Sequence, residues 1–407
     1  MTPEMLLALR DPAGLPSHPL VFLLLGVLTF ALHMAAVQVM LGAGALTLRG
    51  AFSHDAQWRR LAQAMLTTSK IAVSVAIVLG VAPLLFVQVV YDPFWYTSNV
   101  LSAWWVIGFI VVLIAGYLAM YLFYWKNHDL TQAPTRGGWW MVMALALLLA
   151  VGFIVHSLTY QALFPEHWQG WYAPQGVVDP SGQRLRLWHL PRFAFFIALS
   201  APIVGAWLLG YRRYLQGALE SDGAYLAWLR QLGQQWLVRG GAVAALLGLL
   251  WMLTLPEKMA WFATSPYALL SLLTLLGVMA TPLWLGRRLD QGLWGYAVFA
   301  LAVVALLVVG AARELLRYLT LAGSHGYDAL GYRVQMDWYS TLLFFGTFGV
   351  LGGTVLAYFL TVSWQAGQTR GTYSPSPAVQ RLGTWSIALL VAWTVLYFAV
   401  GFYVEAR

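Results

Sequence analysis

The run PSHPLVFLLLGVLTFALHMAAVQVMLGAGALTL, residues 16–48, decides the structural class of this protein. After Pro19 it stays apolar for longer than the roughly 20 residues that cross the ~30 Å hydrocarbon core of a bilayer. His18 stands at its start, and His33 lies 15 residues further along the same run, which is roughly 22 Å along a helix axis. Ionisable side chains inside a membrane are rare and are candidates for function. The run therefore predicts a membrane helix with one histidine at its mouth and a second inside it.

The rest of the chain has the same apolar character. Of its 407 residues, 60% are hydrophobic and 9% are charged. No water-soluble domain of this size buries so much apolar surface, so we expect an all-α, polytopic membrane helix bundle. Ten runs are long enough to span, near 19–48, 67–91, 99–125, 139–164, 190–211, 239–256, 265–286, 292–319, 338–365 and 383–404. They predict a single membrane domain over 1–407, with one four-helix bundle at 19–164, a second at 190–319 and two additional helices at 338–404.

Basic residues predict the orientation. The loops and helix ends on the side reached after the first, third, fifth, seventh and ninth spans hold 14 of the 23 Lys and Arg residues, Arg370 among them. The opposite side holds the remainder, including Arg407. The positive-inside rule places the more basic side in the cytoplasm. We therefore expect a multi-pass protein of the bacterial inner membrane with both termini on the periplasmic side. The net charge of +8 needs no nucleic-acid partner, because the lipid bilayer accounts for it.

One stretch between the predicted spans has the pattern of a helix. Within 212–239, Tyr225, Leu229, Leu232 and Trp236 recur at helical spacing with charges between them. An amphipathic helix of this kind commonly lies in the membrane interface. We expect this stretch to be a separate helix on the membrane surface.

Two kinds of residue are absent where redox or transport chemistry often needs them. The chain has no Cys, which excludes disulfides, thiolate metal sites and covalent haem attachment within it. By the predicted spans, none of the 15 carboxylates lies in mid-membrane. Proton relays and ion-coupled transporters usually need a buried acid, so proton pumping is disfavoured and a transporter is a weaker alternative.

Histidines are the expected ligands for any metal or haem. His18, His156 and His189 all fall in the outer half of the predicted bilayer. A buried neutral imidazole needs a partner, and haem iron is a common one. The sequence predicts these three as iron ligands and His33 as a further cofactor-binding residue. The alternatives are a helix-to-helix hydrogen bond for His33 or His156 and an interfacial position for His18 and His189.

Arginines at the same depth extend this prediction. Arg313 and Arg317 are four residues apart and share one helix face, and Arg192 lies at a similar depth. Basic side chains there can pair with haem propionates. We expect Arg313 and Arg317 to bind them, as part of a site for one or two b-type haems near the outer face. The alternative is that both side chains extend to lipid headgroups.

The layout resembles subunit I of the cytochrome bd quinol oxidases over roughly residues 16–365, through helix order and spacing. In that family a His near the outer start of the first helix ligates a haem of the oxygen site, and Pro16-Ser17-His18-Pro19-Leu20 occupies this position. A second family His opens the fifth helix and ligates the low-spin b haem. Leu187-Trp188-His189-Leu190 occupies that one, and Gly80-Val81-Ala82 in the second helix also follows the family order.

Several family features have no match. The two glutamates of the family's third helix are missing between Ser102 and Tyr117, and the Met ligand of the low-spin haem is missing from Pro266–Leu276, although Met279 follows. The long quinol-binding loop is also missing. Arg313-Glu314-Leu315-Leu316-Arg317 stands near its position, and Glu314 only loosely matches a haem-binding Glu of the family. The resemblance supports the fold and haem binding better than it supports oxygen reduction.

The resemblance implies a bd-like b-haem subunit of a quinone-linked oxidoreductase complex. It would pass electrons between the quinone pool and a c-type cytochrome on the outer face. That cytochrome would carry one haem or several. The Trp-rich outer loop 165–189 is the expected docking surface. Two alternatives remain open. One is a bd-type quinol:oxygen terminal oxidase, and the other is a haem-free membrane anchor or quinone-docking subunit of a redox complex.

Overall fold

The computed structural model describes residues 3–218, 222–369 and 371–405, so Arg370 and Arg407 of the charge count lie outside the described residues. Within these ranges ten helices are long and apolar enough to cross a membrane: Pro19–Ala51, Ala56–Val90, Ala103–Lys126, Trp139–Gln161, Leu190–Gly217, Gly223–Leu253, Pro266–Asp290, Trp294–His325, Trp338–Gly367 and Pro377–Tyr403. The predicted all-α, polytopic membrane bundle is confirmed.

Breaks and short connecting helices divide these spans further. The α-helices are α1 (Pro3–Ala8), α2 (Pro19–Ala51), α3 (Ala56–Val90), α4 (Asp92–Val100), α5 (Ala103–Lys126), α6 (Trp139–Gln161), α7 (Pro165–Tyr172), α8 (Leu190–Ala198), α9 (Ser200–Gly217), α10 (Gly223–Gln235), α11 (Gly241–Leu253), α12 (Pro266–Leu285), α13 (Trp294–His325), α14 (Trp338–Phe345), α15 (Gly353–Gly367) and α16 (Pro377–Glu405). Short 3₁₀ or π segments are η1 (Pro174–Gly176), η2 (Trp236–Gly240), η3 (Glu257–Thr264), η4 (Gly286–Asp290), η5 (Ala329–Gly331) and η6 (Gly346–Gly352).

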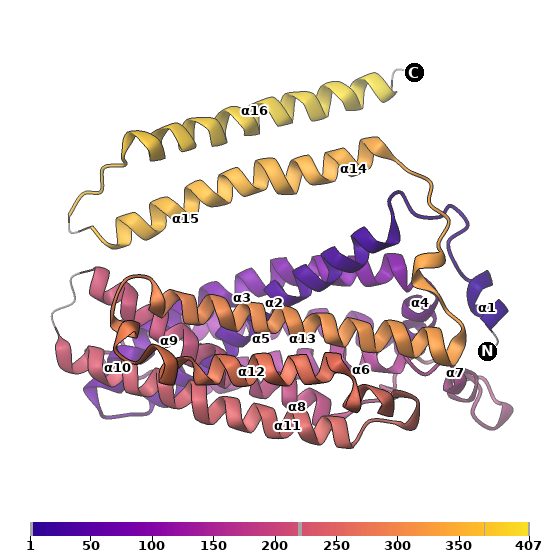
Figure 1. Ribbon diagram of the computed structural model, residues 1–407, viewed down its shortest axis with the longest axis horizontal. Helices are drawn as coiled ribbons and strands as arrows, with labels where there is room; N and C mark the ends of the chain where they lie inside the picture. Colours follow the sequence, from indigo (N-terminus) through magenta and orange to yellow (C-terminus); the bar gives the residue numbers. More distant parts are fainter. Residues whose placement is uncertain (1–2, 219–221, 370, 406–407) are drawn as a thin grey trace. The chain divides into compact units, whose positions relative to one another are not determined.

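The chain forms two compact units. The first comprises residues 1–13, 19–213 and 224–332, and the second comprises 14–18, 214–223 and 333–407, each as far as it is described. In the first unit α2 packs along α3, α5 along α6, α8 against α11, and α13 against both α12 and α2 (Figure 1). In the second unit α15 packs against α16. The single membrane domain of the sequence analysis stays a prediction.

Small residues let the helices of the first unit approach closely. A Cβ on Gly42 of α2 would lie 2.5 Å from Cβ of Val204 on α9, and a Cβ on Gly44 would lie 2.7 Å from a Leu145 methyl on α6. Close approach of backbones is how membrane helices gain packing energy where no water drives them together. These contacts hold α2 close against α9 and α6.

The stretch 212–239 differs from its prediction. Residues 223–253 form one continuous helix, in which α10 passes through the π-helical turn η2 into α11. Tyr225 and Leu229 are fully buried in the first unit. The expected separate surface helix is wrong, because its apolar face packs against neighbouring helices rather than facing an interface. A hydrophobic stripe at helical spacing does not show whether a helix packs against other helices or lies in a membrane interface.

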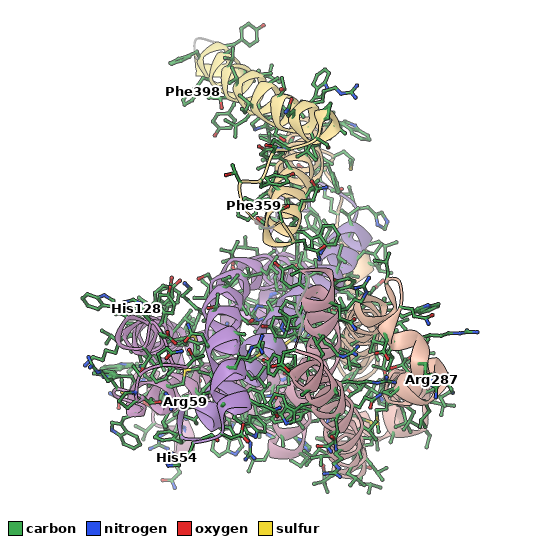
Figure 2. All side chains as sticks on the ribbon, turned by 90° about the vertical axis from the view of Figure 1, so that its left-hand side faces the viewer. His54, Arg59, His128, Arg287, Phe359 and Phe398 are labelled. Carbon is green, nitrogen blue, oxygen red and sulfur yellow. The ribbon has the colours of Figure 1, made fainter. Side chains whose placement is uncertain are left out.

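Within the first unit, the loops near 49–60, 126–136 and 287–288, which the charge count assigns to the cytoplasm, share one end. The connections from α2 to α3 and from α5 to α6 lie at this end, together with η4 (Figure 1). Figure 2 looks along the helices from that end, where His54, Arg59, His128 and Arg287 are labelled. The candidate site described next lies toward the opposite end of the same helices.

Candidate functional site

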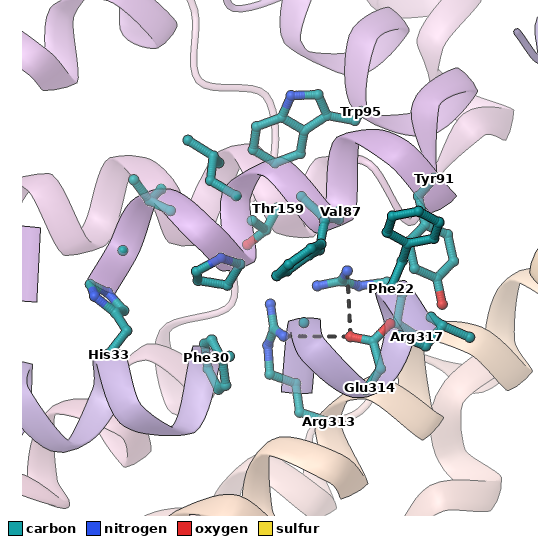
Figure 3. Close-up of a pocket in the computed structure, with 17 residues that line it drawn as sticks. Phe22, Phe30, His33, Val87, Tyr91, Trp95, Thr159, Arg313, Glu314 and Arg317 are labelled. Atoms are coloured by element: carbon teal, nitrogen blue, oxygen red, sulfur yellow. Dashed lines mark ion pairs between the residues drawn. The ribbon is translucent and has the colours of Figure 1, made fainter. Parts of the chain in front are cut away.

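A cavity of about 120 Å³ lies among α2, α3, α4, α6 and α13 of the first unit (Figure 3). Its walls are largely apolar. The polar side chains that line it are His33, Tyr91, Thr159, Arg313, Glu314 and Arg317. Since one water needs roughly 10–15 Å³ on this measure, the cavity has room for several waters or a small ring.

His33 presents one free ring nitrogen at this cavity. Its Nδ1 lies 2.9 Å from the carbonyl oxygen of Ala76 on α3, so Nδ1–H donates to that oxygen. Nε2 has no hydrogen-bond partner among the described residues. Gly80, one turn after Ala76, leaves room for the ring, because a Cβ there would lie 2.8 Å from Cε1 of His33. Histidines that ligate metals are commonly held in this way, with one nitrogen on a carbonyl and the other free.

The opposite part of the cavity is positively charged. On α13, Oε2 of Glu314 lies 3.8 Å from Nη1 of Arg313 and 3.5 Å from Nη1 of Arg317 (Figure 3). All three side chains are at least 84% buried, and Oε1 of Glu314 makes no hydrogen bond within the described residues. Two guanidinium groups thus share one carboxylate. Buried charge that is not balanced is costly, so the site favours an anionic ligand.

Arg192, on α8, adds a third positive charge nearby. Its side chain is buried, and a smaller hollow is lined by Arg192, Arg313 and Arg317 together. This hollow and a third one, beside Phe94, share Thr159 and Arg317 with the main cavity. The three hollows therefore adjoin one another around Thr159 and Arg317.

His156 and His189 lie together, but their ring nitrogens are already used. The backbone N–H of His189 donates to Nε2 of His156 at 3.1 Å, and Nη1 of Arg192 lies 3.4 Å from Nδ1 of the same ring. Nδ1 of His189 accepts from the backbone N–H of Arg192 at 3.3 Å and caps α8, and its Nε2 donates to the carbonyl of Thr254 at 2.8 Å. Iron ligation by either ring would require it to leave these hydrogen bonds.

The structure therefore separates the residues that the sequence grouped. His33, Arg313 and Arg317 line one cavity, whereas His156 and His189 form a hydrogen-bonded cluster with Arg192. His18 belongs to the second unit, where its side chain is exposed. The ligand roles of His18, His156 and His189 stay predictions.

The donor set at the cavity fits haem b better than a bare metal ion. Within the described residues no three or more His, Cys, Asp or Glu side chains are grouped to hold a metal. Haem needs fewer protein ligands: one axial nitrogen, apolar walls and cations for its propionates. His33, the aromatic and aliphatic lining, and Arg313 with Arg317 supply these. A porphyrin is larger than the main cavity alone, and the adjoining hollows at Thr159 and Arg317 extend it.

Sequence reasoning missed several residues of this site. It did not predict the Ala76 carbonyl, the close approach of Gly80 to His33 or the place of Tyr91 at the cavity, because backbone acceptors and close approaches leave no pattern in a single sequence. It named Glu314 as a loose match to a haem-binding Glu, but it did not predict that the carboxylate contacts both Arg313 and Arg317. The turn Tyr91-Asp92-Pro93 at the end of α3 was the available signal for polar groups at the mouth of the cavity.

Comparison with known proteins supports the fold. No family model matches the sequence, and no curated protein matches it. Among solved structures, a chain of the bd oxidase from Geobacillus thermodenitrificans is similar, with 11% sequence identity over 93% of this chain and 99% of that chain and a TM-score of 0.55. The predicted bd-type fold is therefore confirmed, and at this identity the likeness concerns the fold.

Proposed function

We propose that this chain is a b-haem membrane subunit that passes electrons between membrane quinone and a c-type cytochrome at its outer face. The observation that carries the proposal is the cavity in which the free nitrogen of His33 and the buried pair Arg313 and Arg317 line the same space. The bd oxidase fold of the chain supports a place in a quinone-linked complex.

Each residue of the cavity has a distinct role in this proposal. His33 would ligate the iron through Nε2, while the Ala76 carbonyl fixes the tautomer and makes the free nitrogen more basic. Arg313 and Arg317 would bind the propionates by charge-assisted hydrogen bonds. Bound haem would supply one-electron chemistry between a two-electron quinol and a one-electron cytochrome. The apolar walls would exclude water and protect the reduced state.

The loop after α6 is the proposed docking surface for the cytochrome. Tyr172, Val177 and Trp188 in the range 165–189 are exposed, with Val177 72% exposed. Aromatic and apolar side chains on a rim of polar residues are typical of protein interfaces. Trp168 does not take part, since it is buried under α4. The terminal-oxidase alternative has less support, because α5 carries no carboxylate.

A haem-free quinone-docking subunit is the second candidate. The observation that favours it is the engagement of both ring nitrogens of His189 and of Nε2 of His156 in hydrogen bonds. The main cavity also accepts a small ring without rearrangement. In this case the hydroxyls of a quinol head group would donate to the Glu314 carboxylate and to Nε2 of His33.

A reduced-minus-oxidised spectrum of the purified protein separates the two candidates. We expect a b-type band in the wild type, its loss in His33→Ala, and its retention in His54→Ala, which changes an exposed loop histidine. Absence of the band from the wild type would overturn the haem proposal, and quinone binding by that haem-free protein would support the second candidate. A band that survives His33→Ala and disappears in His189→Ala would move the ligand to the predicted cluster.

A further inference from the structure

A second polar cluster lies beyond Tyr91, at the end of the first unit that holds residues 3–13. Asp92 opens α4 and is only 8% exposed. The backbone N–H of Asp11 donates to its Oδ2 at 2.9 Å, and the Tyr332 hydroxyl donates to its Oδ1. Asp11 itself is exposed. Asp92 is therefore a buried carboxylate in direct contact with a residue at the surface, Asp11.

Two tyrosines continue the cluster inward. The Tyr327 hydroxyl lies 3.3 Å from the Tyr332 hydroxyl and 3.1 Å from the carbonyl oxygen of Val90, to either of which it can donate. The guanidinium of Arg10 covers both rings at 4.3 Å from each centroid. Asp92, Tyr332 and Tyr327 thus form one hydrogen-bonded series, and the Arg10 guanidinium covers the two tyrosine rings.

Tyr91 lies between this series and the cavity. Its ring lines the cavity and lies 6.4 Å, centroid to centroid, from the Tyr327 ring. Burial and the nearby Glu314 carboxylate both raise the pKa of Tyr91. The hydroxyl makes no well-formed hydrogen bond among the described residues, so its contact with Glu314 is electrostatic. Oε1 of Glu314 is likewise unsatisfied, and waters in the cavity can bridge the two.

We propose that Tyr327, Tyr332 and Asp92 form a proton route between the cavity, at Tyr91, and the surface at Asp11. The inference rests on the proposed redox function of the cavity. When an electron leaves the site, the local charge becomes more positive and a proton held at the cavity leaves it. Each hydroxyl accepts a proton on its oxygen and passes on its own, and Asp92 delivers one to water. Electron entry reverses the sequence, with one proton taken up per electron.

The acidity of Asp92 suits an exit group. Burial raises its pKa to about 6, although the Asp11 N–H and the Arg10 charge oppose this shift and the Asp11 charge adds to it. A carboxyl of this acidity takes and gives a proton near neutral pH. The groups that face it are Arg10 and Asp11 from the N-terminal segment and Tyr332, with Tyr327 behind it, from the loop after α13. Helices α1 and α7, which both pack against α4, carry the acids Glu4 and Glu166, and Glu166 is paired with Lys258 at 2.6 Å.

The first test is an infrared titration of the purified protein without reductant. We expect a carboxyl band with a midpoint near pH 6 in the wild type and in Asp129→Asn, which changes a fully exposed turn. The band should be missing in Asp92→Asn. A wild type without such a band, or a band that persists in Asp92→Asn, overturns the route whatever cofactor the cavity holds.

The second test measures the rate of proton release that accompanies oxidation of the cofactor. In the wild type, rapid oxidation should release about one proton per electron, and a pH-indicator dye follows its rate. Tyr332→Phe keeps the Asp92 carboxyl but removes its link, so proton release should slow at least tenfold while the infrared band remains. An unchanged rate of proton release in Tyr332→Phe and Asp92→Asn overturns the route. Absence of any redox cofactor would instead overturn the proposed function, and the titration would still decide whether Asp92 is a proton site.

Discussion

His33, His156 and His189 are all imidazoles within the helices or helix ends of one membrane bundle, yet the backbone holds each differently. His33 donates to a carbonyl across a helix interface, His156 accepts from an amide, and His189 caps a helix with one nitrogen and donates with the other. An imidazole whose two nitrogens are occupied stabilises structure, whereas one with a free nitrogen can accept a ligand. This difference is why we place the candidate ligand at His33.

Gly80→Ala tests the position of the His33 ring. A Cβ at residue 80 would lie 2.8 Å from Cε1 and 2.9 Å from Nδ1 of His33, so the ring must move away from Ala76. Loss of that hydrogen bond should lower the free energy of unfolding by about 1 kcal/mol. We also expect weaker binding of the cofactor. Thermal unfolding of the purified protein and its b-band intensity measure the two effects.

Gly108→Ala is the matched control for this substitution. Nothing lies within 4 Å of a Cβ at residue 108 on α5, so alanine should leave stability unchanged or raise it by roughly 0.5–1 kcal/mol through helix propensity. If Gly80→Ala behaved like Gly108→Ala in both measurements, the close packing of His33 against α3 would not matter for the site.

The sequence predicted which residues are unusual at this scale, but not what they bind. An ionisable residue in an apolar run stands out in any sequence, and this found His33, Arg313 and Arg317, which do line one cavity. The partners of His156 and His189 are backbone groups, and every residue has those. Their hydrogen bonds depend on which helices meet, so they could not be inferred from residue types.

At the scale of helices, the apolar runs predicted the existence of every span but not all of their ends. Helix α3 begins at Ala56 rather than near 67, and the sixth span begins at Gly223 rather than near 239. Hydropathy reports which segments avoid water. It does not report where a helix continues beyond the apolar core because its neighbours bind it. Here Asp290 binds Arg212 and Arg230, each at 2.6 Å, and so ties α9, α10 and η4 together.

Gly205→Ala tests the contact between α9 and this extended helix. A Cβ at residue 205 would clash with the backbone nitrogen of Leu237 in η2 and lie 2.8 Å from the carbonyl oxygen of Gly233. Backbone atoms cannot rotate away, so the helices must separate. We expect a loss of about 1–3 kcal/mol in the free energy of unfolding, as for other overpacked cores.

The control for the helix contact is Gly277→Ala on α12, where nothing lies within 4 Å of the added Cβ. Both variants gain the same methyl group and the same helix propensity, so their difference isolates the packing. Equal unfolding temperatures for the two would show that α9 and η2 separate without penalty, and would contradict the packing described for this pair of helices.

At the scale of the whole molecule, both proposals depend on which end of the helices faces outward. The loops richest in Lys and Arg lie at the end opposite Asp92 and the range 165–189 (Figures 1 and 2). A periplasmic cytochrome can reach only the outer end, and a proton that passes Asp92 is released on that side. The positive-inside rule assigns the basic end to the cytoplasm, which favours both proposals.

Cysteine labelling decides the orientation, and the absence of native Cys makes each introduced thiol unique. Asp129→Cys lies in an exposed turn between α5 and α6, and Val177→Cys lies in an exposed segment after α7. A membrane-impermeant maleimide added to intact cells with a permeable outer membrane should label Val177→Cys but not Asp129→Cys. Inverted inner-membrane vesicles should give the opposite result. Since α6 alone separates the two loops, labelling of both from one side would contradict the span at Trp139–Gln161. Reversed labelling would keep the fold but turn the Asp92 exit toward the cytoplasm, and a periplasmic cytochrome could then no longer be the partner at loop 165–189.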